Sequence, residues 1–414
     1  MIKVLKFGGA SIKDSKRIEN VFSIIDKYKG QKIIIVFSAI ANITNLLEDL
    51  VELYVNREAG VKNKLLEIKA IHFGILDNLF NKNDKVYEKI NNIFDEIDLI
   101  LDVKPHKNFS FNYDQIVSKG ELLSSIILSC YLNLKKINNF LLDSRDFIKT
   151  DSKFQNAKID WLLTKKKIKE KITNFPIVTQ GFVGSDMSNN PTTLGREGSD
   201  FTAAIIANSL DVDEVIIWKD VNGVLNADPR YFDNPLLLEN ISFSEAIELA
   251  FYGAKVIHPK TIQPLQQKNI QLSVRSFLNY ENKGTIINSS EPKDIIPLYI
   301  VKENQVLISI SDNNLSFIVE EHLSWIFSVL SKHDVSLNLM QNSAVSFSIC
   351  VDNIKHKTPS LIEELSNKFT VFYNEKVELF TIRHYNSLSI ERVIKNKQIL
   401  LQQKSRNTVQ FIVA

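Results

Sequence analysis

Cysteine is scarce in this sequence, because Cys130 and Cys350 are the only two among 414 residues. Both have apolar neighbours, so we interpret them as small core residues rather than as a disulfide framework or a metal site. No apolar run approaches the ~20 residues that a membrane-spanning helix needs. A strand predicted at residues 2–7 leaves no room for a signal peptide. These absences predict a soluble, cytoplasmic protein.

The sequence also lacks an excess of charge of either sign. Its 50 Lys and Arg residues nearly balance 48 Asp and Glu residues, which leaves a net charge of +2. A dedicated nucleic-acid-binding protein normally carries a concentrated basic excess, so we expect neither nucleic acid nor membrane as a partner. Hydrophobic residues make up 44% and charged residues 24%, as in ordinary globular proteins. A chain of this length predicts two or three domains.

Predicted strands and helices alternate through the first 290 residues. Residues 32–38 and 214–218 are apolar, β-branched runs typical of buried parallel strands. The alternation predicts an α/β fold with a mostly parallel sheet sandwiched by helices. Residues 48–101 contain no proline and repeat apolar residues at helical spacing, which predicts long helices that cover the sheet or form a lid.

The order of the predicted strands and helices changes after the polar stretch 288–294, which we interpret as a domain boundary. The elements that follow have the order β-α-β-β-α-β, the ferredoxin-like unit. Strands are predicted at 298–301, 306–310, 336–340, 344–351 and 371–373, and helices at 320–333 and 360–368. Further strands are predicted at 378–382, 398–401 and 409–413, with no helix expected within 385–414.

A glycine-containing loop leads into an apolar helix near Phe201. Ser199 or Asp200 is a natural N-cap for that helix. A helix N-terminus presents free N–H groups and a positive dipole end, and Arg196 adds a rigid five-donor fork, so the loop suits an anion. Asp200 needs a cation nearby, such as a metal ion. A purely structural capping loop is the alternative at this point.

A second candidate anion site follows the first predicted strand. Lys6 lies at the carboxyl end of that strand, where α/β sheets bind ligands, and Gly8 and Gly9 allow a close backbone approach. The order is not that of a Walker A loop, because the lysine precedes the glycines. Ser38 and Thr44 follow the next strand and are either pocket hydroxyls or turn residues. Glu121, on an otherwise apolar helix, is either solvated or a selector for a substrate ammonium group.

Five stretches of the chain, in this order and spacing, resemble the aspartate kinases (aspartokinases). They are residues 6–11, 38–47, 118–121, 181–200 and 220–259, the last with Asp228, Pro229 and Arg230. The resemblance covers residues 1–290 and implies a catalytic domain of the amino-acid-kinase type. Residues 291–414 are similar to the ACT regulatory region of the family. The implied first ACT unit spans 305–375, and a reduced second unit without its usual helix combines 294–304 with 376–414.

The resemblance implies ATP-dependent phosphorylation of the L-aspartate side-chain carboxylate to 4-phospho-L-aspartate. This reaction opens lysine, threonine and methionine biosynthesis. A carboxylate is already ionised at neutral pH, so it needs no general base. Phosphoryl transfer instead needs alignment and neutralisation of charge, which fits candidates that are mostly lysines, arginines, hydroxyls and glycines. ATP and Mg²⁺ are the implied cofactors, with Mg²⁺ held through the nucleotide rather than by a protein ligand cluster.

The resemblance also assigns roles. Lys6 neutralises the phosphoryl oxygens, and Asp200 organises that lysine and the metal-bound phosphates. The implied substrate-binding residues are Ser38, Thr44, Glu121 for the ammonium group, Arg196 for a carboxylate, and Ser199. The implied nucleotide-binding residues are Lys6, Gly8, Gly9, Ser11, Lys219, Asp220, Leu225, Arg230 and Lys255.

The sequence departs from the family at several positions. Lys219 replaces a threonine common in the family, and Leu225 stands where an aromatic residue is common. Asn338 and Ala344 occupy places where lysine-sensitive relatives tend to carry acids. The effector, lysine or threonine, therefore stays open. ACT units generally pair edge to edge, so a homodimer is expected.

Two other functions are weighed against aspartate kinase. Another amino-acid kinase, acting on glutamate or acetylglutamate, would share single motifs. Glu121 with Arg196 favours a free amino acid over acetylglutamate. A catalytically silent amino-acid sensor would be expected to have lost Lys6 or Asp200, and both are present.

Overall fold

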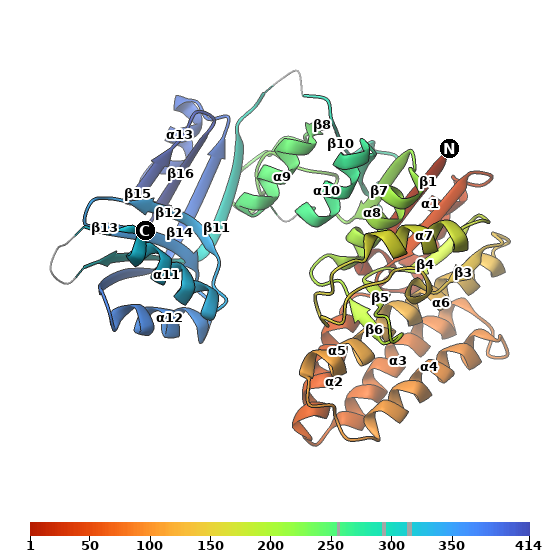
Figure 1. Ribbon diagram of the computed structural model, residues 1–414. Coiled ribbons are helices and arrows are strands. Elements are labelled where there is room, and N and C mark those ends of the chain that lie inside the picture. Colours follow the sequence, from red (N-terminus) through yellow and green to blue (C-terminus); the bar gives the residue numbers. More distant parts are fainter. Residues whose placement is uncertain (255–256, 292–294, 313–316) are drawn as a thin grey trace. The chain divides into compact units, whose positions relative to one another are not determined.

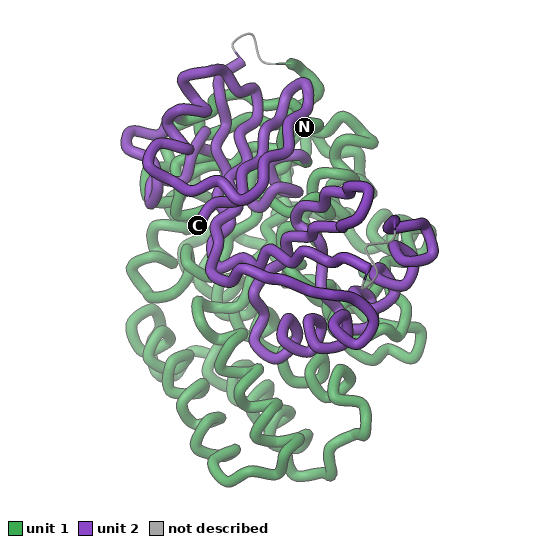
Figure 2. Tube along the Cα trace, turned by 90° about the vertical axis from the view of Figure 1, so that its left-hand side faces the viewer, with its two compact units in different colours: residues 1–224, 237–247, 256–292 green, residues 225–236, 248–255, 293–414 purple. Residues whose placement is uncertain are grey.

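The computed structural model describes residues 1–254, 257–291, 295–312 and 317–414 (Figure 1). The chain forms two compact units that are not consecutive in sequence (Figure 2). Unit 1 comprises residues 1–224, 237–247 and 256–292. Unit 2 comprises residues 225–236, 248–255 and 293–414. Among the described residues, no helix combines the length and apolar character needed to cross a bilayer.

Unit 1 is built on an eight-stranded sheet with the order β3-β4-β2-β1-β7-β9-β10-β8. Its strands are β1 (Ile2–Phe7), β2 (Lys32–Phe37), β3 (Phe140–Leu142), β4 (Ile177–Gln180), β7 (Glu214–Lys219), β8 (Asn240–Ser242), β9 (Gln271–Ser276) and β10 (Thr285–Asn288). All neighbouring strands are parallel except β9 and β10. The predicted, mostly parallel sheet is therefore confirmed. Since β1, β2 and β7 are adjacent and parallel, the segments that follow them meet at one edge.

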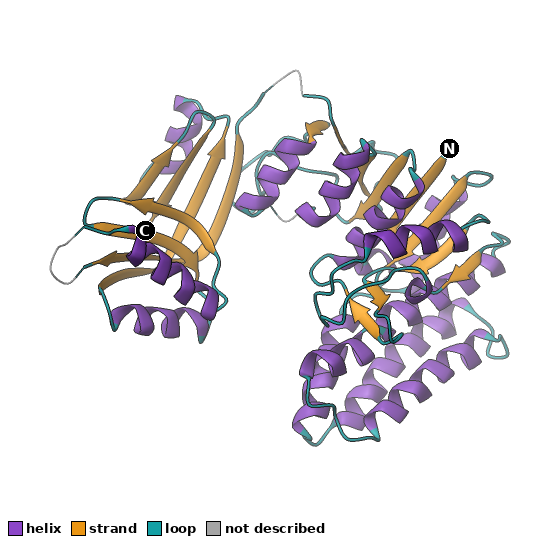
Figure 3. Ribbon diagram, in the orientation of Figure 1, coloured by secondary structure: helices purple, strands orange, loops and turns teal. Residues whose placement is uncertain are grey.

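Helices cover both faces of this sheet, as the sequence predicts (Figure 3). The helices between residues 15 and 268 are α1 (Ser15–Asp26), α2 (Ile43–Asn56), α3 (Val61–Leu79), α4 (Val86–Leu101), α5 (Phe109–Val117), α6 (Lys119–Leu134), α7 (Trp161–Lys171), α8 (Gly198–Leu210), α9 (Phe243–Tyr252) and α10 (Pro259–Lys268), with short 3₁₀ turns at Gly9–Ile12 and Ser144–Asp146. The second half of α9 belongs to unit 2. One face shares a core with α1 to α4 and α6. The other face packs against α8, which α7 and α10 flank.

Two stretches of unit 1 are divided into shorter elements. Residues 109–134 form two helices, α5 and α6, which meet at Ser118. Residues 177–185 form two strands, β4 and β5 (Val183–Ser185), and β5 pairs with β6 (Pro191–Thr193) in a separate hairpin.

Unit 2 contains an antiparallel six-stranded sheet with the order β12-β13-β11-β14-β16-β15. Its elements are β11 (Leu298–Ser311), α11 (Glu320–Lys332), β12 (Leu337–Asn342), β13 (Ser346–Asp352), α12 (Lys357–Ser366), β14 (Thr370–Arg383), α13 (Ser387–Ile394), β15 (Ile399–Lys404) and β16 (Thr408–Val413). The strands predicted at 298–301 and 306–310 are one strand, β11, with a bulge between Lys302 and Gln305. The strands predicted at 371–373 and 378–382 likewise join in β14.

The expectation that residues 385–414 contain no helix is wrong. Helix α13 begins where Asn386 and Ser389 cap each other reciprocally, each side chain accepting a hydrogen bond from the backbone of the other. It is only eight residues long, and it buries Val393 in a core shared with β14 and β16. A search for a long amphipathic helix with a Ser/Thr and Glu/Gln capping box misses this short element. One short helix, α13, therefore lies between β14 and β15.

Candidate active site

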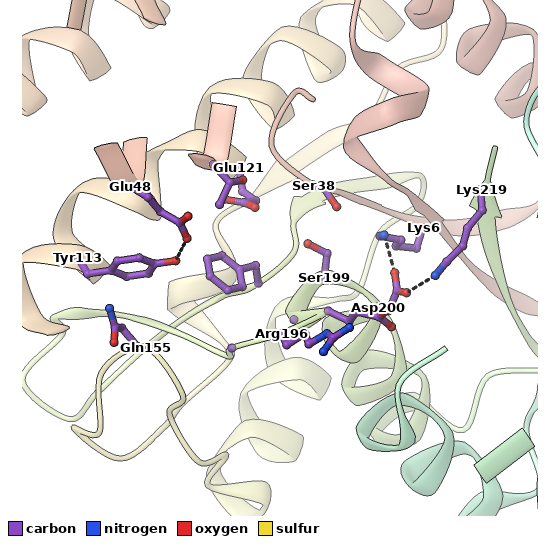
Figure 4. A pocket seen from close by; sticks show the side chains of 15 residues that line it. Lys6, Ser38, Glu48, Tyr113, Glu121, Gln155, Arg196, Ser199, Asp200 and Lys219 are labelled. Carbon is purple, nitrogen blue, oxygen red and sulfur yellow. Dashed lines mark hydrogen bonds and ion pairs between the residues drawn. The ribbon is translucent and has the colours of Figure 1, made fainter. Parts of the chain in front are cut away.

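A cavity of about 630 Å³ lies in unit 1 beside the carboxyl ends of β1, β2 and β7 (Figure 4). Eight of the residues implied by the family resemblance line it: Lys6, Ser38, Thr44, Glu121, Arg196, Ser199, Asp200 and Lys219. They come from six separate parts of the chain, which the parallel sheet and the helices α2, α6 and α8 bring together. The two anion sites suggested by the sequence therefore belong to one cavity.

Asp200 and two lysines form the charged centre at one end of the cavity. Lys6 Nζ lies 2.5 Å from one carboxylate oxygen of Asp200, and Lys219 Nζ lies 3.5 Å from the other. Although burial raises the pKa of Asp200, the charges of Lys6 and Lys219 lower it below its usual value. The side chain is therefore a carboxylate held by two cations. The cation that the sequence requires near Asp200 is supplied by lysine side chains, and the cluster keeps a net positive charge for an anionic ligand.

Two glycines near this charged centre, Gly9 and Gly181, allow neighbouring segments of the backbone to pack closely against each other. A Cβ atom at Gly9 would lie 2.6 Å from the carbonyl oxygen of Ala39, so the turn after β1 and the turn after β2 can touch only at a glycine. A Cβ atom at Gly181 would lie 2.5 Å from the Cβ of Ser199. Both glycines therefore serve packing that positions Lys6 and the start of α8.

Helix α8 begins differently from the prediction. Glu197, with φ of 53°, is its N-cap residue, and neither Ser199 nor Asp200 caps it. Ser199 and Asp200 lie in the first turn, and no side chain of the described residues caps that turn. The first turn of α8 and the exposed Arg196 border the cavity together. This arrangement presents a helix N-terminus and a guanidinium group to one ligand.

Glu121 is a buried acid that forms no ion pair with any of the described residues. It is 3% exposed, lies in the first turn of α6, and accepts a hydrogen bond from the backbone N–H of Ala39. Burial raises the pKa of Glu121 to about 8, although the backbone of Ala39 and the charge of Lys6 act to lower it. Its Oε2 atom has no hydrogen-bond partner in the part of the chain that the structure describes. A ligand ammonium group would supply the missing partner.

Other residues of the cavity are not predicted from the sequence. Glu48, Tyr113 and Gln155 line it, and the Tyr113 hydroxyl donates a 2.6 Å hydrogen bond to Glu48. The buried Asp114 supports this side, accepting hydrogen bonds from the backbone N–H groups of Gln155 and Thr193 and from the Thr193 hydroxyl. Burial raises the pKa of Asp114 to about 6, against the lowering effect of these bonds. Glu48 follows Thr44 by one helical turn, a spacing that could have indicated it.

The remaining implied nucleotide-binding residues do not line this cavity. Gly8, Gly9 and Ser11 lie in the turn after β1, and Ser11 is buried with its hydroxyl donating to the Gly8 carbonyl. Asp220 is exposed after β7. Leu225 and Arg230 belong to unit 2, where Arg230 forms an ion pair with Asp228, and Lys255 lies outside the described residues. Among the described residues, no group of three or more His, Cys, Asp or Glu side chains is placed to hold a metal ion.

Residues 1–276, which hold this whole cavity, match the model of the amino acid kinase family. The chain therefore belongs to the amino acid kinase family. Lysine-sensitive aspartokinase 3 of Escherichia coli is 31% identical over 394 residues, which cover 92% of this chain and 86% of that protein. Within the family, the chain belongs to the aspartokinases, so the resemblance seen in the sequence is confirmed.

Two further comparisons extend this assignment. The bifunctional aspartokinase/homoserine dehydrogenase 2 of Zea mays is 28% identical over 89% of this chain, but this chain spans only 42% of that protein. Crystal structures of E. coli aspartokinase III were solved with aspartate and ADP and with lysine and aspartate. Both are 28% identical, cover 100% of this chain and 96% of that chain, and have TM-scores of 0.83 and 0.84.

Proposed function

We propose that this protein transfers the γ-phosphoryl group of ATP to the side-chain carboxylate of L-aspartate, giving 4-phospho-L-aspartate and ADP. The observation that carries the proposal is the polarity of the cavity. One end has two lysines around Asp200, and the opposite side has the buried Glu121, whose Oε2 atom has no hydrogen-bond partner among the described residues. Aspartate, with an ammonium group and two carboxylates, matches these charges. The aspartate- and ADP-bound relative supports the same substrates.

In the proposed reaction, an oxygen of the substrate β-carboxylate attacks the γ-phosphorus while the bond from that phosphorus to the β–γ bridging oxygen breaks. No proton has to be removed, because the attacking carboxylate is already ionised. Lys6, oriented by Asp200, neutralises charge on the transferred group, and Lys219 adds a second cation. Arg196 binds the α-carboxylate, Glu121 binds the ammonium group, and the hydroxyls of Ser38, Thr44 and Ser199 complete the substrate pocket.

We assign the nucleotide to Gly8, Gly9, Ser11 and Lys219, together with Asp220, Leu225, Arg230 and Lys255. Mg²⁺ would neutralise charge on the phosphates when it is bound with the nucleotide. The residues around Asp200 fit metal-bound phosphates better than a free metal ion, because its carboxylate is already engaged by two lysines. Lys6, Lys219 and the turn at Gly8 would hold such an anionic nucleotide.

We further propose residues 1–290 as the catalytic domain and residues 291–414 as an ACT-type regulatory region that binds lysine or threonine. Asn338 stands where lysine-sensitive relatives tend to carry an acid, and it accepts a 2.7 Å hydrogen bond from Lys302. Because a cation of the protein itself already contacts Asn338, an effector without a charged side chain is favoured. β12 and β15 are the edge strands of the sheet in the described residues, and an edge strand can pair with a second chain, which supports a homodimer. Scarce cysteine supports a cytoplasmic location.

The test is ADP release by purified protein with Mg-ATP and aspartate, glutamate or acetylglutamate, each with and without lysine or threonine. We expect turnover with aspartate alone among the three acceptors. Lys6→Ala should lower kcat by about two to three orders of magnitude, since it removes a charge that acts in the transition state. The exposed Lys16 gives a matched control, and Lys16→Ala should leave kcat unchanged. Absence of aspartate-dependent ADP release would refute the proposed function.

A further inference from the structure

The side of the cavity farthest from the lysines carries a second acid, Glu48. It lies on α2, four residues after Thr44, so both side chains project from the same face of that helix. Figure 4 shows Glu48 across the cavity from Lys6 and Lys219, on the same side as Glu121. The aspartokinase resemblance assigns no role to Glu48.

Tyr113 fixes the position of this acid. Its hydroxyl donates a 2.6 Å hydrogen bond to Glu48, and no other hydrogen bond to the Glu48 side chain occurs in the described part of the chain. Burial, followed by the hydrogen bond to Glu48, raises the pKa of Tyr113 well above its usual value. The phenol therefore remains protonated and acts as the donor, and the pair presents the negative charge of a half-buried carboxylate to the cavity.

The charges in the cavity are consequently separated. The lysine end attracts a carboxylate, whereas Glu48 and Glu121 attract an ammonium group and repel a carboxylate. Glu48 and Glu121 both line the cavity, on the side away from the two lysines (Figure 4). Aspartate carries two carboxylates, and only the one far from the ammonium group is the acceptor in the proposed reaction. Two acids opposite the lysines would thus select one orientation of the substrate.

We infer that Glu48, held by Tyr113, is a specificity residue that reads the substrate ammonium group beside Glu121 and turns the β-carboxylate toward Lys6. The inference rests on the proposed function, since it takes aspartate as the substrate. Glu48 would thereby let the protein distinguish an amino dicarboxylate from a dicarboxylate that lacks the amino group. Glu121 supplies the buried contact, and Glu48 supplies the second charge at the more exposed side.

The experiment compares binding of L-aspartate and succinate, which is aspartate without its ammonium group, to the full chain by titration calorimetry. Glu48→Gln keeps the shape and the hydrogen bond from Tyr113 but removes the charge. We expect aspartate to bind about 5-fold more weakly, as for a half-exposed ion pair, while succinate binds equally well or more tightly. Tyr113→Phe should shift the same ratio in the same direction by a smaller factor. Glu52→Gln, an exposed acid two turns beyond Thr44 on the same helix, should change neither ligand.

The outcomes separate the inference from the proposed function. Weaker binding of aspartate alone supports a role for Glu48 in reading the ammonium group. Equal weakening of both ligands would show that Glu48 only shapes the cavity, and this would overturn the inference. Unchanged binding of both ligands would overturn it as well. If the unmodified protein failed to bind aspartate, the proposed function itself would fail, and the inference with it.

Discussion

At the scale of single residues, Glu121 couples substrate binding to a proton. Burial raises its pKa to about 8, so a large share of the free protein holds a proton on this carboxyl group at neutral pH. An ammonium ligand favours the charged carboxylate and therefore lowers that pKa. Binding of aspartate and loss of the proton are consequently linked.

We predict that L-aspartate binding releases up to one proton per chain at neutral pH and becomes tighter as the pH rises toward about 8. Calorimetry in buffers with different ionisation enthalpies counts the released protons. Glu121→Gln should weaken binding and abolish the proton release, whereas Glu88→Gln, an exposed acid on α4, should change neither. A binding enthalpy that is the same in every buffer would contradict this coupling.

The raised pKa of Glu121 also makes the free energy of unfolding depend on pH. Between the usual carboxyl pKa of 4.5 and about 8, the folded protein holds a proton on Glu121 that the unfolded chain has released. The contribution of Glu121 to the free energy of unfolding is therefore greatest below this window and falls as the pH rises through it. Glu121→Gln removes this dependence, which denaturant unfolding of the free protein at several pH values would show.

Strand ends made many site residues predictable. Lys6, Ser38 and Lys219 lie at or after the carboxyl ends of adjacent parallel strands, so a general rule about α/β sheets places them together. No such rule applies to Glu48 and Tyr113, which lie on helices and are 65 residues apart in the chain. Their pairing depends on how α2 packs against α5, and helix packing of this kind is not readable from sequence periodicity.

At the scale of elements, residues of the segment 225–236 form hydrogen bonds and ring contacts with the rest of unit 2. Asn226 accepts a 2.7 Å hydrogen bond from the backbone N–H of Tyr299 and a second one from Leu236. The ring of Phe232 lies 4.8 Å from that of Tyr299, and the guanidinium group of Arg392 lies 5.4 Å from the Phe232 ring. The segment that carries the proposed nucleotide residues Leu225 and Arg230 is thus part of the core of unit 2.

We predict that Phe232→Ala raises KM for ATP several-fold while KM for aspartate changes little. The substitution removes a buried ring that is 7% exposed, which should cost about 3 kcal/mol in the free energy of unfolding of unit 2. A loosened segment would hold Arg230 less well, but the residues around Glu121 belong to unit 1. Steady-state kinetics and denaturant unfolding measure both effects.

Phe251→Ala is the control, because the Phe251 ring is 66% exposed, and it should change neither KM nor the free energy of unfolding. An unchanged KM for ATP in Phe232→Ala would count against the role of segment 225–236 in nucleotide binding.

The elements of unit 2 were predicted less well than those of unit 1. The polar run from Lys302 to Gln305 interrupts the apolar alternation, so the sequence suggests two strands. Pairing with β14 nevertheless resumes beyond a bulge and keeps β11 continuous. Sequence patterns report side-chain burial, whereas the continuity of a strand depends on backbone hydrogen bonds to its neighbours. The same limit applies to α13, whose short length leaves too few apolar positions for a periodic signal.

At the scale of the whole molecule, the two compact units interleave along the chain. Residues 225–236 and 248–255 belong to unit 2, although they lie between segments of unit 1. Ala227 and Phe232 share a hydrophobic core with Tyr299, Phe380 and Phe411. A cut in the sequence before residue 291 would therefore divide the core of unit 2.

We predict that a chain ending at residue 290 does not behave as an unregulated kinase. Ala227 and Phe232 would lose their core partners, and the Asn226 carbonyl would lose the N–H of Tyr299, so the segment with Arg230 would be unsupported. Titration calorimetry should show ATP binding at least 10-fold weaker than in the full chain, the consequence of losing contacts worth more than about 1.4 kcal/mol. Aspartate, whose proposed ligands all lie in unit 1, should bind with a smaller loss and so serves as the internal control. Adding residues 291–414 as a separate chain should restore part of the ATP affinity by rebuilding the divided core. A truncated chain that binds ATP as tightly as the full chain would contradict the proposed role of Arg230 and its segment in nucleotide binding.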